Sequence, residues 1–216
     1  GVNVIGGGSA FPTGFASFMV VDTLVGTGNI LSNTNSLQSI VTPALNRYTS
    51  GAGVMMYCGS GASSATTLAG GTTLTFTYTN QAGAINRTSS GIVSTNHING
   101  TSIYAPTGDA IGFGYPFCLL QAGDYGVQSI TSFTAGTAAT TGNVVMFLYY
   151  PLMIVCATQN EDDYFEVDLP TRIEALVPLP TTAGGVLGCL NVLCNQYNQN
   201  GTAGLGVQFT FRTVQG

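Results

Sequence analysis

The densest group of acidic side chains lies in the stretch EDDYFEVD, residues 161–168, which holds five of the nine carboxylates of the chain. A glycosidase needs two carboxylates across a sugar cleft, and a calcium loop needs alternating oxygen donors and usually a glycine. The stretch has neither pattern. In an extended strand, Glu166 and Asp168 share one face and Phe165 and Val167 the other. We therefore expect an acidic edge that opposes unwanted strand pairing, with a cation site between subunits as the alternative.

Other groups that could do chemistry are few. His97, the only histidine, lies in STNHINGT without a G-x-S-x-G motif, so we expect a polar loop residue rather than a catalytic base. The glycine-rich pieces VIGGGSAF and IGFGYP contain neither a Walker lysine nor G-x-G-x-x-G. The sequence predicts no catalytic residue, no cofactor site and no metal site. The enzymatic alternative is a glycosidase that uses Asp109, Asp124 or the acidic stretch.

Five cysteines, an odd number at irregular spacing, do not indicate a disulfide framework. Each has apolar neighbours, which favours free, buried thiols in a protein that folds in a reducing cytoplasm. With one histidine in the chain, a zinc site has almost no ligands available. The cysteines are Cys58, Cys118, Cys156, Cys189 and Cys194.

The formal net charge is −5, and charged residues make up only 6% of the chain. There is no lysine, and the four arginines, Arg47, Arg87, Arg172 and Arg212, are scattered. Because no basic stripe exists, we expect neither nucleic acid nor an anionic membrane as a partner. The exterior must consist of Thr, Ser, Asn, Gln and Gly, and a surface this close to neutral favours association.

Short β-favouring runs between glycines predict a single all-β domain over residues 1–216, a β-sandwich of roughly nine or ten strands. Residues 1–14 are expected to form an extended arm. The apolar stretch 144–157 is too short for a membrane span of about 20 residues and predicts two buried strands or one bent around Pro151. Residues 59–71 and 134–143 are expected as loops or hairpin tips, and only residues 35–48 have helical spacing, limited by Pro43. The side chains expected to face the core are Leu74, Phe76, Tyr78, Val207, Phe209 and Phe211.

The second half has a recognisable order: AGDYGVQSITSF, a Gly/Thr-rich hairpin, NVVMFLYYPLMIV, an acidic stretch, LPTRIEALVPLPTTAGGVLGCLNVLCNQ and a final alternating strand. Over residues 108–216 this resembles the virion structural proteins of tailed bacteriophages that decorate or cement a capsid, with their G-V-x-S-[IV]-x-S strand. Gln128 stands where such sequences often carry a basic residue. The resemblance implies a jelly-roll-like sandwich, trimers or other assemblies on a shell, and no catalysis.

The function expected from the sequence is therefore that of a non-enzymatic decoration or cement subunit on the capsid surface of a virion, made in the host cytoplasm. Its partners would be the major capsid protein and further copies of itself, as a homotrimer. A tail, fibre or main shell component is the structural alternative. A carbohydrate-binding adhesive domain is the alternative from another class, and the absence of tryptophan weighs against it.

Overall fold

The computed structural model describes residues 2–5, 16–27, 30–60, 68–94, 102–107, 115, 117–139, 143–157, 190–196 and 206–209. Only the strand backbone is described in β1, β11, β12 and the outer parts of β2 and β10. The strands in chain order are β1 Val2–Ile5, β2 Ala16–Gly26, β3 Ile30–Leu31, β4 Gln38–Ser39, β5 Met55–Ser60, β6 Thr73–Asn80, β7 Arg87–Val93, β8 Tyr104–Ala105, β9 Val127–Ala135, β10 Asn143–Ala157, β11 Leu190–Gln196 and β12 Gly206–Phe209.

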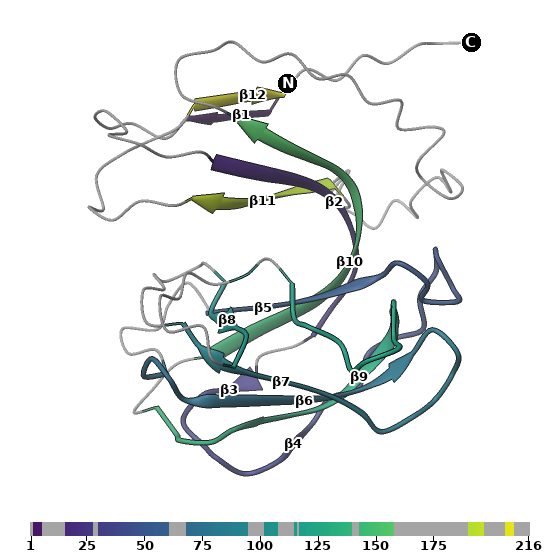
Figure 1. Cartoon of the computed structure of the whole chain (residues 1–216), viewed down its shortest axis with the longest axis vertical. Coiled ribbons are helices and arrows are strands. Elements are labelled where there is room, and N and C mark those ends of the chain that lie inside the picture. The colour runs from purple at the N-terminus through teal and green to yellow at the C-terminus, as the bar shows by residue number, and fades with distance from the viewer. Residues whose placement is uncertain are drawn as a thin grey trace, which may run out of the picture.

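Two five-stranded antiparallel sheets form a β-sandwich, as the sequence predicted. The first has the order β11-β2-β10-β3 with β5 also paired to β10, and the second has the order β4-β9-β6-β7-β8. β1 and β12 pair as a separate two-stranded sheet. Figure 1 shows this sheet at the top, at the opposite end of the molecule from the second five-stranded sheet. Residues 2–5 of the expected N-terminal arm are thus paired with a strand near the C-terminus. The described residues contain no helix, and therefore none long and apolar enough to cross a membrane.

The apolar stretch 144–157 is one continuous strand. β10 lies between β2 and β5, and Figure 1 shows it curving from the sandwich towards β1 and β12. Its pairing with β2 shifts register between Pro151 and Met153, where a proline can be accommodated next to a bulge. Its pairing with β5 ends at Tyr149, so the missing N–H of Pro151 interrupts no bond to β5.

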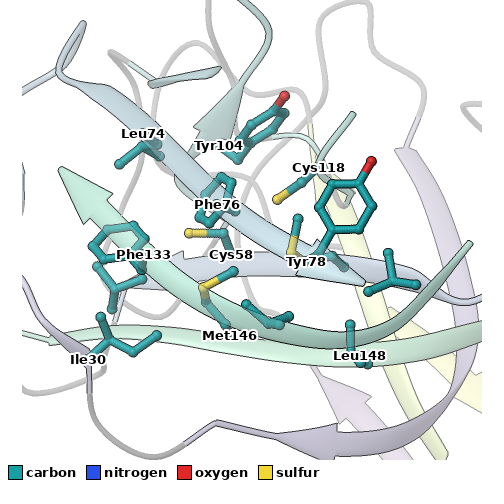
Figure 2. Close-up of a cluster of buried hydrophobic side chains, with 14 of the residues drawn as sticks. Ile30, Cys58, Leu74, Phe76, Tyr78, Tyr104, Cys118, Phe133, Met146 and Leu148 are labelled. Atoms are coloured by element: carbon teal, nitrogen blue, oxygen red, sulfur yellow. The ribbon is translucent and has the colours of Figure 1, made fainter. Parts of the chain in front are cut away.

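The main core lies between the two sheets. Leu74, Phe76 and Tyr78 of β6 are fully buried, as their alternation with threonines predicted. Figure 2 shows them facing Cys58, Met146 and Leu148 from the opposite sheet. Phe76 also packs against Phe133, with ring centroids 5.6 Å apart. Each buried aromatic ring of this kind typically contributes about 3 to 5 kcal/mol to stability.

The outer faces of the two sheets differ in chemistry. On the β5–β10 side a second apolar cluster covers the sheet, and Tyr57 and Phe147 stack within it with ring centroids 4.3 Å apart. On the β6 side the outward residues of the strand are Thr73, Thr75, Thr77 and Thr79. The first sheet is therefore apolar on both sides around β5 and β10, whereas the second sheet has an apolar inner face and a hydroxyl outer face.

The expectation of a helical turn within residues 35–48 is wrong. Gln38 and Ser39 pair with Phe133 and Ser132 as β4, and the Ile40 N–H donates to the Thr131 carbonyl at 2.8 Å. The side chain of Gln38 also donates to the Leu31 carbonyl at 2.7 Å and accepts from the Leu31 N–H at 2.9 Å. Hydrogen bonds to β9 and β3 thus take the place of the backbone bonds that a helix would make. These tertiary contacts override the weak helix propensity of the segment.

The Gly/Thr-rich segment 134–143 is not a hairpin. β9 belongs to the β6 sheet, whereas β10 belongs to the β2 sheet. The segment therefore crosses between the two layers, as the sandwich requires for a chain that fills both sheets. The acidic strand expected within residues 161–168, and the side chains of Val207, Phe209 and Phe211, lie outside what the structure describes.

Candidate functional site

All four charged side chains in the described part of the chain are used in two ion pairs. The acids there are Asp22 and Asp124, and the arginines are Arg47 and Arg87. Each acid pairs with one arginine, so the described part has no net charge. The chain's charge of −5 therefore arises elsewhere, from the other seven of its nine acids and the other two of its four arginines.

The first ion pair lies in the protein interior. The Arg47 Nε donates to Asp22 Oδ2 at 2.9 Å, and a terminal nitrogen donates to Oδ1 at 2.6 Å. The side chains of Arg47 and Asp22 are only 6% and 1% exposed. This two-point geometry satisfies both carboxylate oxygens, which a buried charge requires.

The turn that carries Arg47 is packed tightly onto β10 and β9. Tyr48 stacks on Tyr150 with ring centroids 4.0 Å apart, and Tyr150 is the cross-strand neighbour of Asp22. At Gly126 an added Cβ would lie 1.9 Å from the Gly51 carbonyl oxygen, so only glycine permits this approach. An ion pair, an aromatic stack and a close backbone contact thus all help to hold the turn.

The second ion pair centres on Asp124, in the loop that precedes β9. Asp124 Oδ2 accepts from the Tyr78 hydroxyl at 2.6 Å and from Arg87 Nε at 2.9 Å. Asp124 Oδ1 accepts from the side-chain amide of Asn80 at 2.7 Å. The carboxylate is 3% exposed, but Arg87 remains 27% exposed. Asp124 therefore joins the loop to both β6 and β7.

Two buried tyrosines of the core fasten the same loop. The Tyr78 hydroxyl, besides donating to Asp124, accepts from the Gln121 N–H at 2.8 Å. The Tyr104 hydroxyl donates to the Ser90 carbonyl at 2.9 Å and accepts from the Leu119 N–H at 3.2 Å. Burial raises the pKa of both phenols to about 12, so they remain neutral donors over the physiological range.

The surroundings of Asp124 do not suit a general acid. The Arg87 guanidinium, and then the Tyr78 and Asn80 donors, lower the pKa of the Asp124 carboxyl to about 2 against the opposing effect of burial. A glycosidase acid needs the opposite shift. With three donors on its two oxygens, Asp124 is built as a structural acceptor. Sequence reasoning placed it among the candidate catalytic acids, because a lone loop aspartate gives no sign of its partners.

The sequence analysis did not predict the Asp22–Arg47 ion pair, although the sequence contains one indication of it. Asp22 is the only charged residue in the apolar strand β2, and a buried charge needs a partner. The scarcity of basic residues leaves four arginines to choose from. Nothing in the local pattern selects Arg47, because the contact depends on how the 47–54 turn folds back onto the sheet.

Two of the five cysteines have described side chains, and both are free and buried, as predicted. Cys58 and Cys118 lie in the core between the sheets (Figure 2). Burial raises the pKa of both thiols, with the neighbouring Cys58 a smaller contribution at Cys118. Such thiols are poor nucleophiles and poor metal ligands.

Gln128 sits at a β-bulge in β9. Its side-chain amide donates to the Ser50 carbonyl at 3.1 Å and to the Gln81 carbonyl at 3.3 Å. The position thus needs a hydrogen-bond donor that reaches two loops, which glutamine supplies without a charge.

The remaining sequence candidates, His97, Asp109 and the acidic stretch 161–168, lie outside the described residues. Within the described residues no three His, Cys, Asp or Glu side chains gather as a metal site would need. A small hollow lined by Ser32, Ser60, Leu68, Ile103, Asn143 and Val144 encloses about 10 Å³, which is the space of a single water molecule.

What the described residues bring together is therefore a set of anchored loops on a surface without net charge. In comparisons with known proteins, the chain matches no family model, no curated protein and no solved structure.

Proposed function

We propose that this protein is a non-enzymatic structural subunit of a virion, a bacteriophage capsid decoration or cement protein. It binds the major capsid protein and further copies of itself and thereby stabilises the particle. The order of elements in residues 108–216 supports this assignment through the resemblance described above. A jelly-roll-like topology and a homotrimer belong to the same proposal.

One observation carries the proposal: the described surface of the sandwich offers almost no charge. Both arginines and both acids in this part are held in ion pairs, and only Arg87 is partly exposed. Large apolar side chains such as Leu37, Val41 and Ile85 are well exposed. Water-exposed proteins usually carry mixed charges that oppose association. A neutral exterior with exposed aliphatic groups is instead suited to permanent contact with neighbouring subunits.

The anchored loops support the same reading. The loop from residue 117 to 126 is fastened by Tyr78, Tyr104 and Asp124, yet it exposes Leu119 and Tyr125. Apolar groups on a rigid loop lose little conformational entropy on binding, which favours a preformed contact surface.

The test is the copy number and position of the protein in purified particles. Quantitative mass spectrometry should find it in proportion to the major capsid protein, and labelled antibodies should decorate the shell in electron micrographs. Removal of the protein should lower the temperature at which the particles release their nucleic acid, because bound subunits stabilise a shell by mass action. Absence from purified particles would refute the proposal.

The structural alternative, a tail or fibre component, is separated by the same measurement. Shell proteins are present in many more copies per particle than tail parts, and a tail protein would be labelled at one vertex only. The carbohydrate-binding alternative is separated by a glycan array, on which a decoration protein without adhesive function should bind nothing.

A further inference from the structure

The outer face of the β4-β9-β6-β7 sheet carries hydroxyl groups in register. Cross-strand pairing places Ser39 beside Ser132, Ser132 beside Thr77, and Thr77 beside Thr88. A second row runs through Thr134, Thr75 and Ser90. The sheet lies at the lower end of Figure 1, and no described element covers its outer side.

Apolar side chains border these rows at two places. Leu37 and Val41 flank Ser39 at alternate positions of the edge segment and are 68% and 91% exposed. Ile92 pairs with Thr73 at the other side of the face. We call the outward residues of these four strands, together with Leu37 and Val41, the hydroxyl face.

The edge of the hydroxyl face is firmly held. Thr42 Oγ1 accepts from the Ile130 N–H at 3.1 Å, and the Ile40 N–H donates to the Thr131 carbonyl at 2.8 Å. Gln38 adds two bonds to the backbone of Leu31. Leu37 and Val41 are therefore exposed on a backbone that is already ordered, and their burial by a partner would cost little conformational entropy.

We propose that the hydroxyl face is a contact surface for the same face of a second copy of this chain. The inference rests on the proposed function, since it names the surface by which two subunits of such an assembly meet. A face that binds the same face of another copy relates the two copies by a two-fold axis. This contact is therefore distinct from the three-fold contacts of the proposed homotrimer.

Complementarity favours a second copy over other partners. A hydroxyl group both donates and accepts hydrogen bonds, so a face of Thr and Ser can pair with itself. The face carries no charged residue. A charged partner would leave its own charges desolvated and unpaired there. The described surface of this chain is itself neutral, and two copies can meet without that cost.

The area of the face sets the strength of the contact. β6 spans eight residues, which is about 26 Å at roughly 3.3 Å per residue, and four strands are about 19 Å wide. The face therefore covers about 500 Å², and two copies would bury about 1,000 Å². Specific stable interfaces begin at about 1,200 Å². The contact is accordingly weak in isolation and depends on concentration.

The test is sedimentation of the full chain over a range of concentrations, from about 10 μM to about 1 mM. The wild type should sediment as a species of twice the mass found for the Thr77→Lys variant at the highest concentration. If the smaller species is a trimer, it carries three such faces, so the mass then rises by a factor of two or more. Thr77 lies at the centre of the face, and a lysine there would bring two unpaired charges together across the contact.

Two further variants make the result decisive. Ser90→Lys changes an exposed position of the same face, so it should also halve the mass even if Thr77→Lys fails to fold. Val145→Lys adds the same charge at an exposed position of β10 in the other sheet, and it should keep the wild-type mass. Equal masses for the wild type and both face variants would overturn the inference, as would loss of association in Val145→Lys.

Binding of a neutral oligosaccharide that competes with association, and that is lost in Ser90→Lys, would also overturn the inference and assign the face to sugars.

The outcome of the sedimentation experiment is independent of the outcome of the particle experiment. A protein found on the shell whose face variants sediment unchanged would refute the interface alone. Pairing through this face in a protein absent from particles would refute the proposed function alone.

Discussion

The two ion pairs solve the same problem in opposite arrangements. In the first, the acid Asp22 lies on a strand and Arg47 on a turn, whereas in the second Arg87 lies on a strand and Asp124 on a loop. Both fasten an irregular segment to a sheet. The first is closed from water on both sides, but the second leaves its guanidinium partly exposed. We therefore expect the stability of the fold to depend more on the buried pair, Asp22–Arg47, than on the partly exposed pair, Asp124–Arg87.

The difference in burial predicts a difference in what each broken pair costs. When its acid is removed, a buried guanidinium cannot be solvated by water instead, whereas an exposed guanidinium can. The second pair compensates with neutral donors, since Tyr78 and Asn80 also bind Asp124. The comparison can be tested from the largest effect to the smallest.

The largest effect is expected for Asp22→Asn. The substitution removes the negative charge opposite the buried Arg47 guanidinium and should lower the free energy of unfolding by about 3 to 5 kcal/mol. Urea unfolding followed by circular dichroism measures it. The double variant Asp22→Leu with Arg47→Met removes both charges and should recover most of the loss. A double variant as unstable as the single one would show that the pair contributes more than charge compensation.

The next effect is expected for Tyr78→Phe. The ring stays in the core, but the Asp124 carboxylate loses a donor and the Gln121 N–H loses its acceptor. Two net hydrogen bonds correspond to about 1 to 3 kcal/mol. Tyr57→Phe, which removes a hydroxyl from the second apolar cluster without breaking a hydrogen bond of the described residues, is the matched control and should cost less. A larger loss in the control would contradict the role assigned to the loop anchor.

Acid should weaken the second pair through Asp124. Its pKa in the folded protein, about 2, lies below the value of about 3.9 expected in the unfolded chain. The stabilising contribution is therefore complete above about pH 4 and is lost as the pH falls towards 2. The stability difference between wild type and Asp124→Asn, measured by urea unfolding, should shrink across that interval. A difference that stays constant between pH 5 and about pH 2 would contradict the shift.

The smallest effect is expected for Arg87→Lys. Arg87 donates to both Asp124 and the Ala122 carbonyl, and a lysine cannot reproduce the fork of the guanidinium. The charge remains and water reaches the site, so the melting temperature should fall by less than in any variant above. Arg47→Lys should cost clearly more, since its two-point contact is buried. Equal losses for the two lysine variants would remove the distinction between the pairs.

Local sequence determined the strands whose two faces differ. The alternation of Leu74, Phe76 and Tyr78 with threonines predicted both the strand and its buried side, because side chains alternate in a pleated strand. The continuous apolar run 144–157 predicted two buried strands or one bent around Pro151, and the structure has the single strand β10. The apolar neighbours of Cys58 and Cys118 predicted buried thiols. The low number of charges predicted a neutral surface.

Only the tertiary structure decided the rest. Residues 38–39 form a strand, not a helical turn, because β9 offers partners for their backbone. The chain crosses between layers after Ala135, since β10 finds its neighbours in the other sheet. The pairing of Asp22 with Arg47 and the donors around Asp124 join residues 25 to 46 positions apart. Such contacts depend on how turns fold back onto sheets, and no local pattern of residues encodes that geometry.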